Sequence, residues 1–165
     1  MPYYTVRKME ESDWDAVSRI YEQGINSNLA TLTLSCPSFE EWDSTHLNQC
    51  RLVITESDEV IGWAALMPFS ARSAYSGVVE SSIYIDRSKR HRGAGRTLLQ
   101  SLISLTEQED IWSIQAIILR ENHPSIRLHE SCGFRVVGYR ERLGRDRFGA
   151  WRDMIIMERR SPKED

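Results

Sequence analysis

Hydrophobic residues recur along the chain with two different periods, which separate predicted strands from predicted helices. Runs rich in β-branched and aromatic residues predict strands over 3–8, 51–56, 60–69, 78–86, 113–119, 134–141 and 150–157. Apolar positions three and four residues apart predict a helix capped by Ser12, a helix capped by Ser38, a third ending near Glu107 and a fourth over 125–132. Both kinds of element are therefore expected in one fold.

The order of these elements, β-α-α-β-β-β-α-β-α-β-β, predicts a fold of the α/β (α+β) class. It indicates a mixed sheet with helices rather than a repeating βαβ array. Residues 57–59 are expected to form a short hairpin connection, and the polar residues 26–37 a loop. With 165 residues and no repeat or linker, we expect a single domain over 1–160 and a frayed tail over 161–165.

The composition is typical of a globular protein and narrows the range of partners. A net charge of −3 argues against bulk attraction to nucleic acid or to an anionic membrane, and no apolar run approaches the roughly 18–20 residues that span a bilayer. The first residues lack an apolar signal-peptide core, and the three cysteines are odd in number, so we expect a reduced, cytoplasmic protein. The histidines show no ligand spacing, so no metal is expected.

The segment Arg90–Arg96, RHRGAGR, carries the strongest chemical signal in the chain. It follows the predicted strand over 78–86 and precedes an amphipathic helix. Glycines let backbone N–H groups turn towards a ligand, and a helix N-terminus favours negative charge, so the segment predicts phosphate binding. It lacks the Gly-Lys-Ser/Thr ending of a Walker loop and the three glycines of a dinucleotide fingerprint. A solvated basic turn or a nuclear-localisation-like patch is the alternative, which the flanking strand and helix disfavour.

Several blocks of sequence, in one order and at fixed spacings, carry a family resemblance. Residues 90–95 match the loop pattern Arg/Gln-x-x-Gly-x-Gly/Ala. Further blocks are Ala74-Tyr75, Val79-Glu80 before Ser82–Ile85, Glu121-Asn122 with Ser125–Glu130 and Gly133-Phe134, and Gly149–Met154. Over nearly its whole length the chain resembles GNAT-superfamily N-acetyltransferases, and within them the phosphinothricin acetyltransferase family. The resemblance implies the GNAT fold, with a mostly antiparallel central sheet that is flanked by helices and splayed at the acetyl-CoA-binding strand.

The resemblance implies that acetyl-CoA is the cosubstrate and assigns its contacts to three segments. The pyrophosphate is expected at the loop residues Arg90, His91, Arg92, Gly93, Ala94, Gly95 and Arg96. Backbone groups of Ile83, Tyr84 and Ile85 are expected to pair with the extended pantetheine arm as an added strand. Asn122, and Ser131 with it, are expected to approach that arm. Capping of the turn that follows is the alternative for Asn122.

Glu80 is a carboxylate in the middle of an otherwise apolar strand, which is costly to bury unless the group is paired or functional. One interpretation is a structural ion pair, for example with an arginine of the C-terminal strands. In the other, Glu80 holds the acceptor ammonium or accepts its proton, because only the neutral amine attacks a thioester. The resemblance favours Glu80 as the principal catalytic residue.

His129 is the second catalytic candidate. Many members of the superfamily have a tyrosine at this helix position, which protonates the departing CoA thiolate. His129 also shares a helix face with Ser125, four residues earlier. Packing or contact with the substrate is the alternative role, since a thiolate is already a fair leaving group.

The expected acceptor is a small molecule with an amine, of the phosphinothricin or methionine sulfoximine or sulfone type, acetylated by direct attack in a ternary complex. The resemblance assigns its pocket to Arg72, Ser73, Ala74, Tyr75 and Glu80. Arg72 is the candidate cation for an acceptor carboxylate. A protein N-terminal, polyamine or aminoglycoside acetyltransferase, and a non-catalytic acyl-CoA-binding module, are the alternatives. The resemblance also implies a homodimer.

Overall fold

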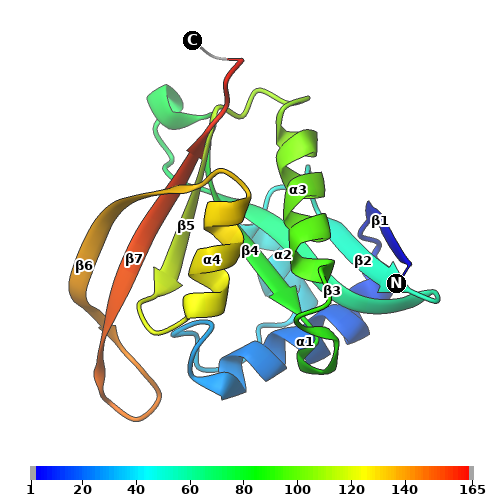
Figure 1. Cartoon of the computed structure of the whole chain (residues 1–165), viewed down its shortest axis with the longest axis horizontal. Helices are drawn as coiled ribbons and strands as arrows, with labels where there is room; N and C mark the ends of the chain where they lie inside the picture. The colour runs from blue at the N-terminus through cyan, green and yellow to red at the C-terminus, as the bar shows by residue number, and fades with distance from the viewer. Residues whose placement is uncertain (1–2, 164–165) are drawn as a thin grey trace.

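A seven-stranded sheet forms the centre of the structure, a computed structural model that describes residues 3–163 (Figure 1). Its strands are β1 (Tyr4–Lys8), β2 (Leu52–Glu56), β3 (Glu59–Pro68), β4 (Val78–Ile85), β5 (Ser113–Leu119), β6 (Arg135–Arg145) and β7 (Trp151–Arg160). They lie in the order β1-β2-β3-β4-β5-β7-β6, and all neighbours are antiparallel except β4 and β5. The predicted mixed, mostly antiparallel sheet is confirmed.

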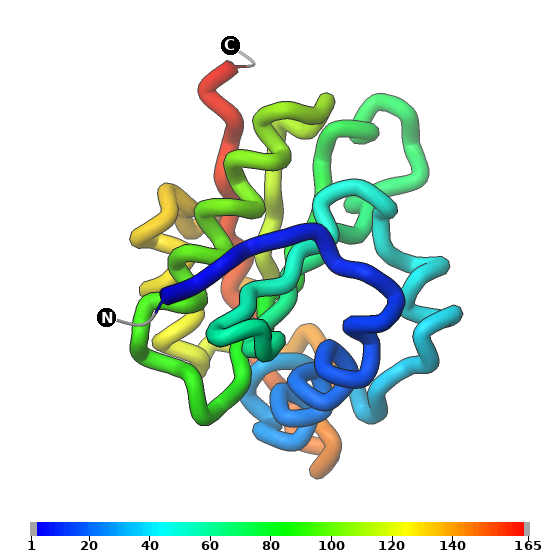
Figure 2. The backbone as a smooth tube through the Cα atoms, turned by 90° about the vertical axis from the view of Figure 1, so that its right-hand side faces the viewer, coloured from blue at the N-terminus to red at the C-terminus, as the bar shows by residue number. Residues whose placement is uncertain are grey.

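Helices cover both faces of this sheet (Figure 1, Figure 2). They are α1 (Trp14–Ser27), α2 (Phe39–Thr45), α3 (Ala94–Thr106) and α4 (His123–Ser131), with short 3-10 helices at Glu11–Asp13, Ser73–Tyr75 and Arg87–Lys89. α3 and α4 lie over the face that holds the larger apolar core, and α1 and α2 pack on the other face. The predicted order of helices and strands is confirmed.

β3 is buried on both sides because it contributes to both cores. Ala64 and Leu66 pack in the core that includes Leu98 of α3, whereas Trp63 and Ala65 face the aromatic cluster of α1 and α2. Successive strand residues point to opposite faces, so a strand between two helical layers is apolar at consecutive positions. This is the physical reason for the continuous apolar run in this strand.

The connection between β2 and β3 is a two-residue turn. Ser57 and Asp58 have φ values of 50° and 64°, as in a type I′ turn, and Glu56 pairs with Glu59. The predicted short hairpin is confirmed, with one residue fewer in its turn.

The start of α1 differs from the prediction. Ser12 lies inside the 3-10 helix that precedes α1 and does not cap it. The buried Asp13 organises this turn instead, because its carboxylate accepts hydrogen bonds from Arg7 and from the Glu10 N–H, each at 2.8 Å. Ser38 does cap α2, through a backbone N–H 3.2 Å from its hydroxyl.

The predicted frayed tail is packed as far as the structure describes it. Ser161 is buried, and its hydroxyl donates to Glu107 at 2.7 Å, while Lys163 Nζ donates to the Glu107 carbonyl at 3.2 Å. Arg159 pairs with the same carboxylate at 2.7 Å. These contacts join the end of β7 to the end of α3. Residues 164–165 of the predicted tail lie outside the described residues.

β4 and β5 pair over a short distance and then part. The pairs are Val78 with Ser113, Val79 with Ile114 and Glu80 with Gln115. β4 stays paired with β3 as far as Ile85, so beyond Glu80 its other edge is open. The splay that the resemblance implies is therefore present, and it begins at Glu80.

Replacing Gly24 tests how closely α1 packs on β4. A Cβ at Gly24 would lie 2.6 Å from Tyr84 Cε1, whereas a Cβ at Gly138 would meet nothing within 4 Å. We expect the Gly24→Ala variant to lose about 1–3 kcal/mol of unfolding free energy through overpacking. Helix propensity alone would raise the unfolding free energy by about 1 kcal/mol, so a loss of stability shows that overpacking outweighs propensity. Urea denaturation measures the unfolding free energy of each variant, with Gly138→Ala as the control. A Gly24→Ala variant as stable as wild type would contradict the packing.

Candidate active site

The parting of β4 from β5 opens a cleft of 340 Å³. Its wall consists of Glu80–Tyr84 from β4, Ala116–Ile118 from β5, residues 30–33 from the loop after α1, and Tyr21, Met67, Asn122, Ser125, His129 and Met154. Both predicted catalytic residues, Glu80 and His129, share this cleft with the predicted cofactor residues Ile83, Tyr84 and Asn122. The loop residues 30–33 were not predicted, because their polar, turn-rich sequence contains no motif that marks a binding wall.

Glu80 enters the cleft without an ionic partner. Within residues 3–163 its carboxylate forms no ion pair, and burial raises its pKa. Among residues 3–163, the structural ion pair with an arginine of the C-terminal strands is absent; Arg152 and Arg159, for example, pair with Asp146 and Glu107. A half-buried carboxylate with a raised pKa is a stronger base than an exposed one, which suits it to accept a proton.

Tyr84 forms the aromatic side of the cleft. Its ring stacks on Trp63 with centroids 4.9 Å apart and lies 5.0 Å from the ring of Tyr21. Burial raises the pKa of its hydroxyl, Tyr21 and Glu80 raise it further, and the Thr31 side chain lowers it. Tyr84 therefore stays neutral and adds a hydrogen-bonding group, rather than a second negative charge, to the neighbourhood of Glu80.

His129 is held in one tautomer. Its Nδ1 lies 2.7 Å from the carbonyl oxygen of Ser125, which can only accept, so Nδ1 carries the proton. The ring is 2% exposed and packs edge-on against Phe134 at 4.9 Å. Burial lowers the pKa of His129, so its Nε2 is an unprotonated acceptor at neutral pH. A proton donated from Nε2 would require the imidazolium form, which burial disfavours.

The loop at 90–96 leads into the N-terminus of α3, as predicted. His91 and Gly93 have φ values of 63° and 88°, and the Thr97 N–H donates to the Gly93 carbonyl at 3.1 Å. The N–H groups of residues 93–96 precede this first helical bond and have no partner inside the helix. They form the kind of N-terminus that binds phosphate.

The cations of this loop are partly engaged in the fold. Lys89 and Arg92 pair with Glu56 at 2.7 and 3.1 Å, and Arg90 Nε donates to a β4 carbonyl at 3.3 Å. The side chains of Arg90 and Arg96 are exposed. Arg90 and Arg96 are therefore the more available cations for an anionic ligand.

Asn122 and Ser131 lie at opposite ends of α4. The Asn122 side chain accepts from the Ser125 N–H at 3.4 Å, so the capping role is confirmed, and it also lines the cleft. Ser131 is exposed, donates to the Leu128 carbonyl at 2.7 Å and lies outside the cleft wall. Asn122, rather than Ser131, is positioned to reach a ligand in the cleft.

The predicted acceptor segment stands apart from the cleft within this one chain. Arg72, Ser73, Ala74 and Tyr75 are exposed, and they do not line the cleft. Tyr75 packs edge-on against Phe69, with ring centroids 6.0 Å apart. Their role in binding the acceptor stays a prediction.

Three further features of the described part of the chain concern metal ligands, membrane helices and thiols. Residues 3–163 contain no group of three His, Cys, Asp or Glu side chains placed to hold a metal ion. In the same range, no helix is long and apolar enough to cross a membrane. Burial raises the pKa of the Cys50 thiol to about 11 and also raises that of Cys36, which disfavours nucleophilic thiolates at these positions.

Comparison with known proteins agrees with this geometry. Residues 6–156 match the family model described as an acetyltransferase (GNAT) domain. The chain is 30% identical to phosphinothricin N-acetyltransferase of Streptomyces viridochromogenes, over 93% of this chain and 86% of that protein. It is 27% identical to the L-methionine sulfoximine/L-methionine sulfone acetyltransferase of Pseudomonas aeruginosa, over 93% and 92%.

A solved structure extends the likeness to the fold. The GNAT superfamily phosphinothricin acetyltransferase from Sinorhizobium meliloti, in complex with AcCoA, matches with a TM-score of 0.83 and 30% identity. The match covers 95% of this chain and 88% of that one. Together with the family model, these matches establish that the chain belongs to the GNAT acetyltransferase family.

The tautomer of His129 is open to direct measurement by nitrogen-15 NMR. At neutral pH we expect a protonated Nδ1 and a bare Nε2, with a titration midpoint below the ordinary value of about 6.5. Since folding disfavours the charged ring, the stability it contributes is complete above that value and is lost as the pH falls through the lowered pKa. A protonated Nε2, or a raised midpoint, would contradict this assignment.

Proposed function

We propose that this GNAT protein moves the acetyl group of acetyl-CoA to the amine of a small amino-acid-like acceptor, of the phosphinothricin or methionine sulfoximine or sulfone type. The observation that carries the proposal is Glu80, a carboxylate that lies in the cleft between the splayed strands and forms no ion pair within residues 3–163. The named activities of the relatives and the AcCoA-bound neighbour support both substrates. The amine nitrogen bonds to the thioester carbon, the C–S bond breaks, and the CoA thiolate leaves.

Acetyl-CoA suits the groups that the chain offers on both sides of the splay. The open edge of β4 at Ile83–Ile85 presents backbone groups to an extended, amide-rich chain such as the pantetheine arm. The free N–H groups of residues 93–96, with the exposed Arg90 and Arg96, suit a pyrophosphate. Asn122 offers an amide to the same arm from the start of α4.

Glu80 acts on the acceptor amine, which arrives mostly as ammonium at neutral pH. The ionised carboxylate holds the ammonium and accepts its proton, directly or through one water, as the nitrogen attacks. Burial raises the pKa of Glu80, which makes its carboxylate a stronger base for this proton. The bare Nε2 of His129 contributes an acceptor that contacts the substrate.

We extend the proposal to a cytoplasmic homodimer. β6 is an edge strand that exposes large apolar side chains, namely Val136, Val137, Tyr139 and Leu143. A long apolar edge is a ready surface for a second copy of the chain. The free thiols of the three cysteines suit a reducing compartment.

A thiol-release assay across a panel of acceptors tests the substrate class. The panel holds phosphinothricin, methionine sulfoximine, methionine sulfone, a polyamine, an aminoglycoside and a peptide. We expect kcat/KM to be at least about tenfold higher for the amino-acid-like acceptors, because a built polar site discriminates strongly. A preference for the peptide, the polyamine or the aminoglycoside would replace the proposal with that activity. Binding of acetyl-CoA without turnover of any acceptor would favour a non-catalytic module.

The Glu80→Gln variant keeps the shape of the side chain and removes the base. We expect kcat to fall by about 10²–10⁴-fold, the usual contribution of a positioned base, with an unchanged KM for acetyl-CoA. In wild type, the rate should rise with pH through the raised pKa of Glu80, since a protonated carboxyl cannot take the proton. The pH–rate profile of Glu80→Gln should lack this rise. The exposed Glu59→Gln variant is the control, and an unchanged kcat in Glu80→Gln would remove Glu80 from catalysis.

A further inference from the structure

The cleft wall at residues 30–33 belongs to a segment without regular structure. Residues 29–37 lie between α1 and α2 and, within the described chain, form no backbone–backbone hydrogen bond. Residues 30–33 nevertheless line the cleft together with Glu80. Inside the segment, Thr31 Oγ1 accepts from the Thr33 N–H at 3.1 Å, and contacts from outside the segment add to this local bond in fixing its position.

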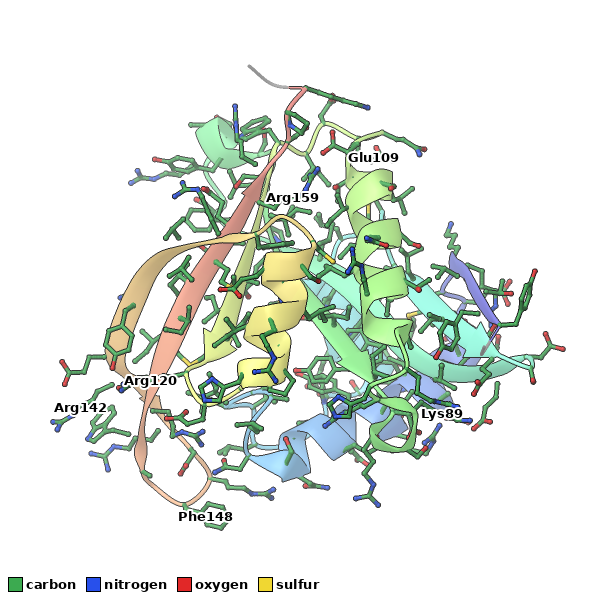
Figure 3. All side chains as sticks on the ribbon, viewed as in Figure 1. Lys89, Glu109, Arg120, Arg142, Phe148 and Arg159 are labelled. Atoms are coloured by element: carbon green, nitrogen blue, oxygen red, sulfur yellow. The ribbon has the colours of Figure 1, made fainter. Side chains whose placement is uncertain are left out.

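The tip of the β6–β7 hairpin lies beside the C-terminal part of α1, where this segment starts (Figure 2). Phe148 at the tip points away from the rest of the chain and is 79% exposed (Figure 3). Asp146, two residues earlier, has a side chain that is only 5% exposed. The hairpin tip thus engages the fold through Asp146, and also through Arg147, whose Nη1 donates to Asn26 Oδ1 at 3.2 Å.

The two carboxylate oxygens of Asp146 accept hydrogen bonds from different sets of partners. Oδ1 accepts from the N–H groups of Phe148 at 2.9 Å and Ala150 at 3.0 Å, which closes the hairpin turn. Oδ2 accepts from Asn28 Nδ2 at 3.0 Å and Arg152 Nη1 at 3.2 Å, which reaches the segment after α1. The hydrogen bond from Asn28, helped by the others, lowers the pKa of Asp146 to about 2, so the group is ionised at neutral pH.

Arg152 completes the connection. Its Nη1 also donates to the Asn28 carbonyl at 2.9 Å, and its Nη2 pairs with Glu121 at 3.3 Å, next to the cap of α4. Its side chain is 13% exposed. A largely buried guanidinium with partners on three segments fixes the segments relative to one another.

An apolar contact adjoins these hydrogen bonds. A Cβ at Gly144 of β6 would lie 2.7 Å from Leu32 Cδ1, so Leu32 fits against the hairpin because position 144 has no side chain. Leu32 is itself part of the cleft wall. The hairpin therefore supports this wall both at its start and at Leu32.

We infer that Asp146, Arg152 and Asn28 form a clamp that positions the acceptor side of the cleft. Through this clamp, the β6–β7 hairpin sets the affinity for the acceptor without touching it. The inference rests on the proposed function, because it requires residues 30–33 to face the acceptor. The groups offered to acetyl-CoA at the open edge of β4 and the start of α3 lie outside the clamp.

The Asp146→Asn variant breaks the clamp and spares the turn. Its remaining oxygen can still accept hydrogen bonds from the two turn N–H groups. Its new NH₂ group, however, faces Asn28 Nδ2 and Arg152 Nη1, which are also donors, so these two hydrogen bonds are lost. We expect KM for the amino-acid acceptor to rise about tenfold, as for a lost charge-assisted hydrogen bond, with KM for acetyl-CoA unchanged. Hydrogen exchange should quicken at the amides of Leu29 and Thr33, which donate to the hydroxyls of Ser27 and Thr31 at 3.2 and 3.1 Å. Unchanged acceptor KM and unchanged exchange would overturn the inference.

Asp153→Asn is the matched control. Asp153 of β7 likewise accepts from a backbone N–H, that of Arg142 at 2.8 Å, and from the side chains of Tyr139 and Arg120. These partners lie outside residues 29–37. We expect both KM values and the exchange of the segment to stay at wild-type levels. Equal effects of Asp146→Asn and Asp153→Asn would indicate a general weakening of the hairpin and overturn the clamp.

A double variant separates positioning from a merely structural role. Asn28→Asp alone opposes two carboxylates, but in combination with Asp146→Asn the amide and the carboxylate exchange places and can bond again. We expect the double variant to bring the acceptor KM most of the way back to the wild-type value, and no recovery would overturn the clamp.

If wild type acetylates no amino-acid-like acceptor, the proposed function fails. Hydrogen exchange in Asp146→Asn still decides whether the clamp holds the segment.

Discussion

The parting of β4 from β5 is the constraint on which the rest of the site depends. The two strands pair only as far as Glu80 and Gln115, after which β4 stays on β3 and β5 stays on β7. This geometry leaves a row of unpaired backbone groups on β4 and opens a cleft beside it. α4 and the segment after α1 contribute to the wall of that opening, while α3 begins near the end of β4.

The position of Glu80 at the start of the splay supports the catalytic role that we propose for it. Its backbone is paired on both sides, with Met67 and Gln115, so the carboxylate is carried on a fixed strand. Its side chain enters a cleft in which burial raises its pKa and where no cation of the described chain neutralises it. Tyr84, four residues later on the same face, is anchored by Trp63. A fixed, partly desolvated base is what proton transfer from an ammonium requires.

The sequence predicted those parts of the site that local pattern determines. The strand, glycine turn and helix around 90–96 follow from neighbouring residues, and an isolated carboxylate in an apolar strand marks Glu80. The hydrogen bond from Asn28 to Asp146 joins residues 118 positions apart, so no local pattern could reveal it. The same holds for the cleft wall at 30–33. Ser12 was wrongly expected to cap α1 because the buried pair of Arg7 and Asp13, a tertiary contact, organises that turn.

A crystal structure with an acceptor joined covalently to CoA tests the central claim most directly. Such an adduct fixes the nitrogen where it attacks the thioester. The account predicts that this nitrogen lies within about 3 Å of the Glu80 carboxylate, or one bridging water away, with the pantetheine arm along the open edge of β4. A nitrogen on the other side of β4, out of reach of Glu80 even through a water, would contradict the account.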